Sequence, residues 1–257
     1  MAQTKTKSRF IGWFAPIILL ILWQLSIVTG IIRFRYFPSP VAVAQAFLRL
    51  ANSGRFYGNL SHTVIVTLVA WIIATILGVL FGLLIGLSLP VWKGVMASVD
   101  VLRSLPIIAL VPVGVIIFGF TLRLEIVIAT YAALWPILVN TVSGVRQTRS
   151  ELLDIGRIIR MSRVERVWKL ILPSALPLIL VGLRLGLGLS LVLAIVTEIV
   201  GTPNGIGYAL INAEQALHPA QMFVYILVTG VIGYLLNGLF IFSARRILSA
   251  EKSAEKN

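Results

Sequence analysis

ELLDIGRIIRMSRVERVWKLILP, residues 151–173, is the longest polar interruption in the second half of a strongly apolar chain. Basic residues are closely spaced in it and just before it: Arg146, Arg149, Arg157, Arg160, Arg163, Arg166 and Lys169. Apolar residues recur among them at helical spacing: Ile155, Ile158, Ile159, Val164, Val167 and Trp168. Ser162 followed three residues later by Glu165 has the pattern of a capping box, which predicts that a second short helix starts there. The stretch therefore predicts two short helices joined by a bend at residues 160–162, with an apolar ridge in a basic frame that is suited to docking.

The composition of the whole chain is that of an all-α integral membrane protein. Of its 257 residues, 58% are hydrophobic and only 12% are charged, and the mean hydropathy is +0.99. Soluble domains have about 25% charged residues, and the apolar runs here are too long and continuous for a membrane β-barrel. The chain has no cysteine, which excludes a disulfide framework and a thiolate nucleophile. The net charge of +13 lies mostly beside the apolar runs, which argues against nucleic acid as a partner.

Six membrane spans are predicted from apolar runs of about 20 residues. They cover residues 10–32, 64–88, 100–120, 125–145, 174–200 and 222–246, and the first is interpreted as an uncleaved span rather than a signal peptide. Residues 33–62 are expected to form an external loop with an interfacial helix. Lys and Arg are concentrated in alternate connections, so the positive-inside rule places both termini and residues 146–173 in the cytoplasm. We expect one membrane domain over residues 1–257.

Prolines and glycines mark special positions inside these spans. Pro106 and Pro112 predict a bent or broken third span, and Pro136 lies inside the fourth. Three glycines at four-residue spacing share one face of the second span: Gly78, Gly82 and Gly86. Small residues let membrane helices approach closely, so this face serves either fixed packing or sliding during gating.

Four ionisable residues lie at membrane depth: Asp100, Arg103, Arg184 and Glu198. Charges there are costly and usually face the bundle interior or water. They either line a translocation path or gate, or form structural pairs. Structural pairing is favoured for Asp100 and Arg103, which are three residues apart, whereas Glu198 is the stronger functional candidate.

The sequence carries no signature of bond chemistry. It contains no Gly-rich phosphate loop ending in Lys-Ser or Lys-Thr, no Ser-His-Asp order and no HExxH spacing. His62 and His218 are far apart in sequence and are interpreted as interfacial residues rather than metal ligands. We therefore expect no catalytic residue, no metal and no cofactor.

Residues 151–173 resemble the coupling loop of type I ABC importer permeases. That signature has a Glu-Ala-Ala opening, a Gly six residues after the Glu, and a later Leu-Pro pair. Asp154, Ile155 and Gly156 fall on the opening, Arg160 on the Gly, and Leu172-Pro173 on the closing pair. Arg160 departs from the pattern, because a Gly at such a bend supplies a left-handed conformation that costs other residues about 1 kcal/mol. Either Arg160 adopts that conformation or the bend is made differently.

The resemblance extends from residue 37 to residue 248 and is to the permeases of the nitrate, sulfonate and taurine branch. It is carried by Phe37-Pro38-Ser39-Pro40, Leu105-Pro106, Leu110 to Pro112, Trp135-Pro136-Ile137, Asn140-Thr141, Gly144, Leu172-Pro173, Ala175-Leu176-Pro177, Gly182-Leu183-Arg184, Glu198 and Gly205-Ile206-Gly207-Tyr208.

This resemblance implies a non-catalytic permease in the bacterial inner membrane, working as a homodimer by alternating access. It implies two cytoplasmic ABC ATPase subunits, which hydrolyse ATP, and an extracytoplasmic binding protein that delivers a small solute such as nitrate, sulfonate, taurine or bicarbonate. The face formed by Ile155, Ile158 and Ile159 would insert into the ATPase, and the partner surface should be acidic because the loop is basic. Candidates for the path or gate are Glu198, Arg184, Pro106, Pro112 and Pro136.

Two other functions stay open from the residues alone. An ion-coupled secondary transporter would need a relay of ionisable groups through several spans, for which Glu198 is the fair candidate. A membrane scaffold or enzyme without transport is the other alternative.

Overall fold

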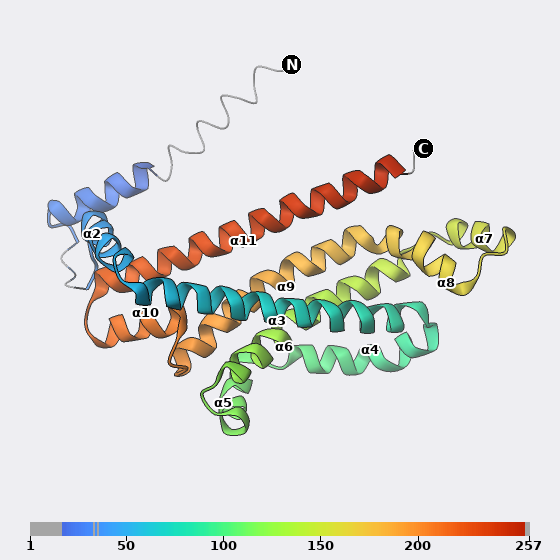
Figure 1. Cartoon of the computed structure of the whole chain (residues 1–257), viewed down its shortest axis with the longest axis horizontal. Helices are drawn as coiled ribbons and strands as arrows, with labels where there is room; N and C mark the ends of the chain where they lie inside the picture. The colour runs from blue at the N-terminus through green and yellow to red at the C-terminus, as the bar shows by residue number, and fades with distance from the viewer. Residues whose placement is uncertain (1–16, 33, 35, 255–257) are drawn as a thin grey trace, which may run out of the picture.

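The longer helices of this chain lie lengthwise in an elongated bundle, whereas α2 and α5 run across it (Figure 1). The computed structural model describes residues 17–32, 34 and 36–254, and side chains up to residue 246. The described part is helical, with a first helix at Ile17–Val28. The elements that follow are α2 (Pro40–Ala51), α3 (Gly54–Leu87), α4 (Leu89–Ser104), α5 (Ile107–Phe118), α6 (Leu122–Arg146), α7 (Ser150–Ile158), α8 (Arg163–Arg166), the π-helical turn η1 (Val167–Ile171), α9 (Leu172–Val200), α10 (Gly205–Gln215) and α11 (Pro219–Ala254).

The core of the bundle is formed by α3, α6 and α9, which pack on one another more extensively than any other elements. Glycines make this close approach possible. A Cβ on Gly78, Gly82 or Gly86 would lie within 2.9 Å of a side-chain carbon of Ile137, Thr141 or Val145, respectively, on α6. The glycine face predicted from the sequence therefore packs directly against α6, because only a residue without a side chain fits there.

Four helices are long and apolar enough to span a membrane: α3, α6, the continuous helix Arg163–Val200, and α11 up to Arg246. The pair α4 and α5 passes the same test together, but bends by 83° at the Leu105-Pro106 break. These helices correspond to the predicted spans from residue 64 onward. In the first predicted span, residues 10–16 lie outside the described residues and Ile17–Val28 is a shorter apolar helix. The count of six stays a prediction.

Two boundaries differ from the sequence prediction. The external loop is predicted to run to residue 62. In the structure α3 already begins at Gly54, so residues 54–62 belong to the same helix as the apolar run that follows them. The second short helix of the 151–173 stretch was predicted to be separate from the fifth span. Instead, α8 continues through η1 into α9, and Leu172 N–H donates to Val167 O across the π-helical turn just before Pro173. A π-helical turn lets the helix continue although Pro173 has no N–H to donate.

The two prolines of the third predicted span behave differently. Pro106 is the N-cap residue of α5 and marks the break, as the sequence predicts for a broken span. Pro112 lies inside α5, which continues past it to Phe118.

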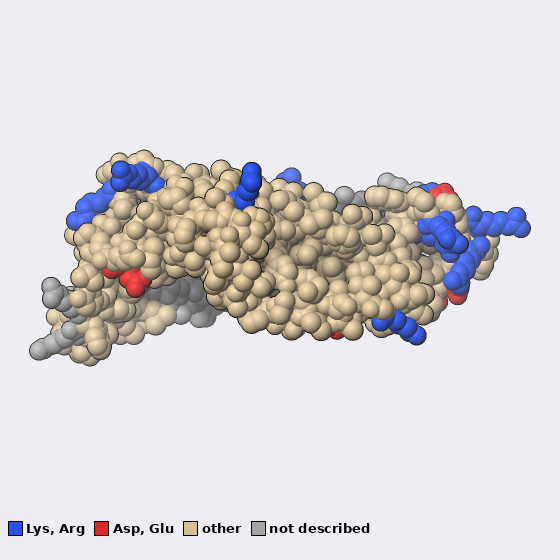
Figure 2. Space-filling view, turned by 90° about the horizontal axis from the view of Figure 1, so that it is seen from below, with Lys and Arg blue, Asp and Glu red and all other residues tan. Residues whose placement is uncertain are grey.

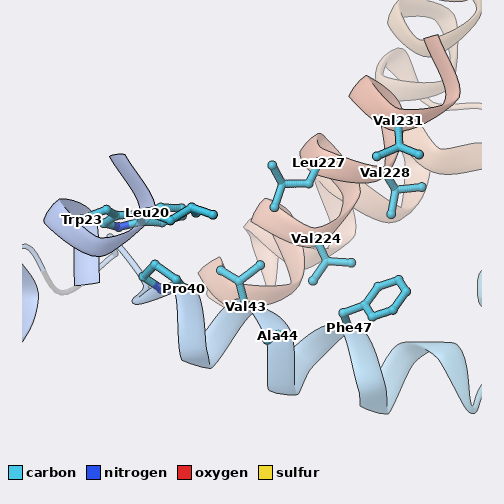
Figure 3. A pocket seen from close by; sticks show the side chains of 10 residues that line it. All are labelled: Leu20, Trp23, Pro40, Val43, Ala44, Phe47, Val224, Leu227, Val228 and Val231. Atoms are coloured by element: carbon cyan, nitrogen blue, oxygen red, sulfur yellow. The ribbon is translucent and has the colours of Figure 1, made fainter. Parts of the chain in front are cut away.

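Charged side chains gather towards the two ends of the molecule, and the long middle of one face is almost free of them (Figure 2). This distribution suits a protein whose middle lies in lipid. A groove of about 300 Å³ opens between the helix Ile17–Val28, α2 and α11 (Figure 3). Its lining is apolar and includes Trp23, Val43, Phe47 and Val224, so it offers no charged group that could bind a solute.

Candidate functional site

The bend in the 151–173 stretch is made by Arg160 in the left-handed conformation, with φ 54°. Two backbone hydrogen bonds close the turn: Met161 N–H donates to Gly156 O (2.9 Å), and Arg160 N–H donates to Arg157 O (3.0 Å). This is the Schellman pattern that usually carries Gly at the position of Arg160. Of the two alternatives that the sequence leaves open, Arg160 therefore adopts the left-handed conformation itself, at its energetic cost.

The elements on either side of this bend are fixed locally and by contact. Ser162 Oγ accepts from Glu165 N–H (3.2 Å) and Ser162 N–H donates to Glu165 Oε2 (3.0 Å), so the predicted capping box is present. Gly156 is buried, and a Cβ there would lie 2.8 Å from Leu170 Cδ1. This close approach holds α7 against η1.

An apolar face on α7 and at its end is open to the surface. Ile158 is 79% exposed, and Ile155 and Ile159 are also exposed. Asp154, on the same helix, pairs with Arg157 (2.8 Å). Figure 1 shows α7 and α8 at one end of the bundle, so this face projects from the molecule at a single end.

A second group of predicted residues lines two shallow hollows along the bundle. One, of about 330 Å³, is lined by Pro136, Asn140 and Arg103, and the other, of about 420 Å³, by Arg184 and Asn237. The two hollows share Leu189 and therefore adjoin each other. Arg103 pairs with Asp100 (2.9 Å), as expected from their spacing. Pro106 and Pro112 are not among the residues that line either hollow.

Glu198 lies away from both hollows, in a polar cluster near the opposite end of α9 from the 151–173 stretch. Its side chain is 0% exposed and accepts hydrogen bonds from Thr63 Oγ1 (2.7 Å) and Gly207 N–H (2.8 Å). Beside it, His62 Nε2 lies 2.8 Å from Glu125 Oε2, and Glu125 is 1% exposed. His62, whose side chain is 21% exposed, thus joins two buried carboxylates, a grouping that the sequence did not predict.

Sequence reasoning did not single out Glu125, which is the first residue of the predicted span 125–145. The one available signal was an isolated acidic residue at the edge of an apolar run. His218, the other histidine, follows α10, where its N–H donates to Ala213 O (2.9 Å), and it is far from this cluster in sequence.

Residues 74–251 match the family model described as the binding-protein-dependent transport system inner membrane component. The chain is 34% identical over 227 residues to the putative aliphatic sulfonates transport permease protein SsuC of Escherichia coli, covering 88% of this chain and 86% of that protein. It is 28% identical over 244 residues to the SsuC protein of Bacillus subtilis, covering 95% and 88%.

The fold is similar to a solved structure titled "Inward facing conformations of the MetNI methionine ABC transporter", with a TM-score of 0.64 and 22% identity. That match covers 75% of this chain and 94% of the other. Fold, family model and relatives agree with the helical bundle described above. The chain belongs to the binding-protein-dependent transport system inner membrane component family and is a non-catalytic permease subunit of an ABC importer.

Proposed function

We propose that this permease transports a small organic anion of the sulfonate type, and that Arg184 meets the anion inside the membrane. Arg184 lies near the middle of α9, and its Nε donates to Asn237 Oδ1 (2.8 Å) on α11. Among the described residues no acidic side chain pairs with it. An unneutralised cation at membrane depth is costly, and a transported anion would offset that cost while it passes. This single observation carries the proposal.

The names of the relatives agree with a negatively charged solute. Both SsuC proteins are named for aliphatic sulfonates, which carry one negative charge on three oxygens. A planar guanidinium suits such a group, because it offers several N–H donors in a fixed fork. Nitrate and bicarbonate also present several anionic oxygens and are the natural competitors in an assay.

We propose a homodimer as the working unit. In a single copy, Arg184, Asn140 and Asn237 border hollows that open on the side of the bundle. Open polar groups are unfavourable against lipid. A second copy placed over the hollows would enclose these groups and form a polar path between the two chains.

We also propose that α7 is the coupling helix. Its isoleucine face is exposed at the end of the bundle, beside the arginines of the 146–173 stretch. Burying an isoleucine side chain contributes about 1.5–3 kcal/mol of favourable free energy. Because Ile158 is largely exposed in this chain, most of that free energy would be gained when a partner covers it. The partner is an ABC ATPase with an apolar groove in an acidic rim, and ATP-driven movement of this partner reorients the spans. The binding protein docks at the opposite, extracytoplasmic end.

The substrate is tested by uptake into proteoliposomes that contain the permease, its ATPase and its binding protein. We expect Arg184→Gln to reduce uptake of an alkanesulfonate at least about tenfold, because about 1.4 kcal/mol of lost stabilisation is enough for that factor. Arg123→Gln is the control, since Arg123 is exposed at the start of α6. Full uptake by Arg184→Gln would refute the role of Arg184. Saturable uptake of a neutral or cationic solute would refute the proposal that the transported solute is an anion.

Coupling is tested in the same vesicles by Ile158→Asp. We expect loss of ATP-driven uptake and weaker co-purification of the ATPase, with normal insertion of the permease in the membrane. Glu151→Gln, on the same helix and also exposed, serves as the control. Unchanged uptake in Ile158→Asp would contradict docking through α7. Uptake by the permease alone under a pH gradient would support the secondary transporter, although family membership favours the ABC importer.

A further inference from the structure

A cluster of potential metal ligands joins three helices near the end of the bundle opposite α7. His62 comes from α3, Glu125 from α6 and Glu198 from α9. One ligand atom from each residue lies within 4.8 Å of the others. Glu198 is 26 residues from the start of α9, which places the cluster roughly 40 Å from the 151–173 stretch. The proposed transport path and the coupling helix use none of these three residues.

The charges in this cluster do not balance. Both carboxylates are buried, and in the described part of the chain neither forms an ion pair with a Lys or Arg. His62 can supply at most one positive charge against two negative ones. Burying an unpaired carboxylate is strongly unfavourable, so the site requires a further positive charge. A bound cation or a retained proton would supply it.

Glu125 has one oxygen left for a cation. Its one polar partner among the described residues is the His62 ring, which meets Oε2, although the side chain is only 1% exposed. Neutral His62 Nε2 can accept an O–H from a protonated Glu125, so a retained proton is the alternative that the experiment must separate from a metal. As a carboxylate, Glu125 can offer its other oxygen to a metal ion.

Hydrogen bonds fix the position of the Glu198 carboxylate, as is usual for a residue that coordinates a metal. Thr63 Oγ1 and Gly207 N–H fix its two oxygens, and Thr63 Oγ1 itself accepts from Ile206 N–H (2.9 Å). Gly205 leaves the room for this carboxylate, since a Cβ there would overlap it. Such outer hydrogen bonds orient metal ligands and set their basicity.

We propose that His62, Glu125 and Glu198 bind a divalent cation of the zinc class. One imidazole and two carboxylates form a ligand set that zinc accepts, whereas magnesium and calcium prefer oxygen ligands alone. Tetrahedral zinc holds its ligand atoms about 3.3 Å apart, so His62 and Glu125, now 2.8 Å apart, need to separate only slightly. The His62 side chain is 21% exposed, which gives the ion access and leaves the fourth position to water.

Such an ion would tie α3, α6 and α9 together at one end of the core. Zinc bound here stabilises the packed bundle at this end, because the ion binds only when all three helices are in place. The role is separate from the transport of the anion, so its test does not depend on uptake.

The test uses the full-length permease purified in mild detergent, with zinc measured by elemental analysis and stability measured by thermal unfolding. We expect about one zinc ion per chain, a lower Tm in EDTA, and recovery with zinc but not with magnesium. Zinc at about one hundred times its Kd should raise the Tm by about 5–10 °C.

His62→Gln and Glu125→Gln should lose both the bound zinc and the zinc-dependent rise in Tm. His218→Gln, which changes the other histidine, should keep both. His62→Cys replaces one zinc ligand by another and should bind Co²⁺ with a thiolate charge-transfer band. If the histidine at position 62 were merely structural, the cysteine variant would show no such band. A folded wild-type chain without zinc, whose Tm is the same in EDTA and in zinc, would overturn the proposal and assign the missing charge to a proton.

Discussion

Replacing Gly82 by alanine is expected to push α3 and α6 apart. A Cβ on Gly82 would lie 2.6 Å from Thr141 Cβ, 2.8 Å from Thr141 Cγ2 and 3.0 Å from Leu138 O. Carbon atoms normally pack at about 3.5–4.0 Å, so the helices would have to separate by about 1 Å. Neither the Thr141 Cβ nor the helix backbone can move away independently. Overpacking of this kind costs about 1–3 kcal/mol.

Gly230→Ala is the matched control for this change. Gly230 also lies inside a predicted span, on α11, but a Cβ there would meet no atom within 4 Å. Both variants make the same substitution in a helix, so the difference between them isolates the packing cost. For a chain of this size we expect Gly82→Ala to unfold about 2–12 °C below Gly230→Ala.

The measurement is thermal unfolding of the purified permease in mild detergent, followed by intrinsic fluorescence. A double-mutant cycle with Thr141→Gly, which removes both contacting carbons, should show favourable coupling between positions 82 and 141. If Gly82→Ala unfolds at or above the temperature of Gly230→Ala, the α3–α6 contact is not as tight as described. Absence of coupling in the cycle would likewise refute the reasoning.

Three further predictions concern backbone and capping. Arg160→Gly should raise stability by about 1 kcal/mol, because glycine adopts the left-handed bend without strain; a lower Tm would contradict this. Ser162→Ala should cost about 0.5–2 kcal/mol at the start of α8, visible as faster amide hydrogen exchange there, whereas Ser162→Thr should keep the cap. Gly205→Ala should lower the Tm more than Gly119→Ala, since both positions have positive φ but only Gly205 faces the Glu198 carboxylate. Equal losses would mean that strain alone explains both.

Much of the fold follows from local sequence signals. Apolar runs, the break at Pro106 and the capping box at Ser162 depend on residues close together in the chain, and all three are observed. The same holds for the spacing that placed a bend at residue 160. Helix boundaries were less accurate, because nothing local separates the end of a polar helix from the start of the next span at residue 173.

The candidate site divides in the same way. The exposed isoleucines of α7 were predictable, because amphipathic spacing within one helix fixes which residues share a face. The grouping of His62 with Glu125 and Glu198 was not, because these residues lie on three different helices. Only the packing of α3 on α6 and α9 brings their ends together.

By itself, the sequence determined that this chain is a helical membrane protein with a basic, apolar-ridged segment, because hydropathy and capping act over a few residues. The tertiary structure alone decided which side chains meet across the bundle: Gly82 with Thr141, Arg184 with Asn237, and His62 with Glu125. The physical reason is that helix pairing depends on complementary surfaces far apart in the chain, and no local pattern specifies which surfaces will match.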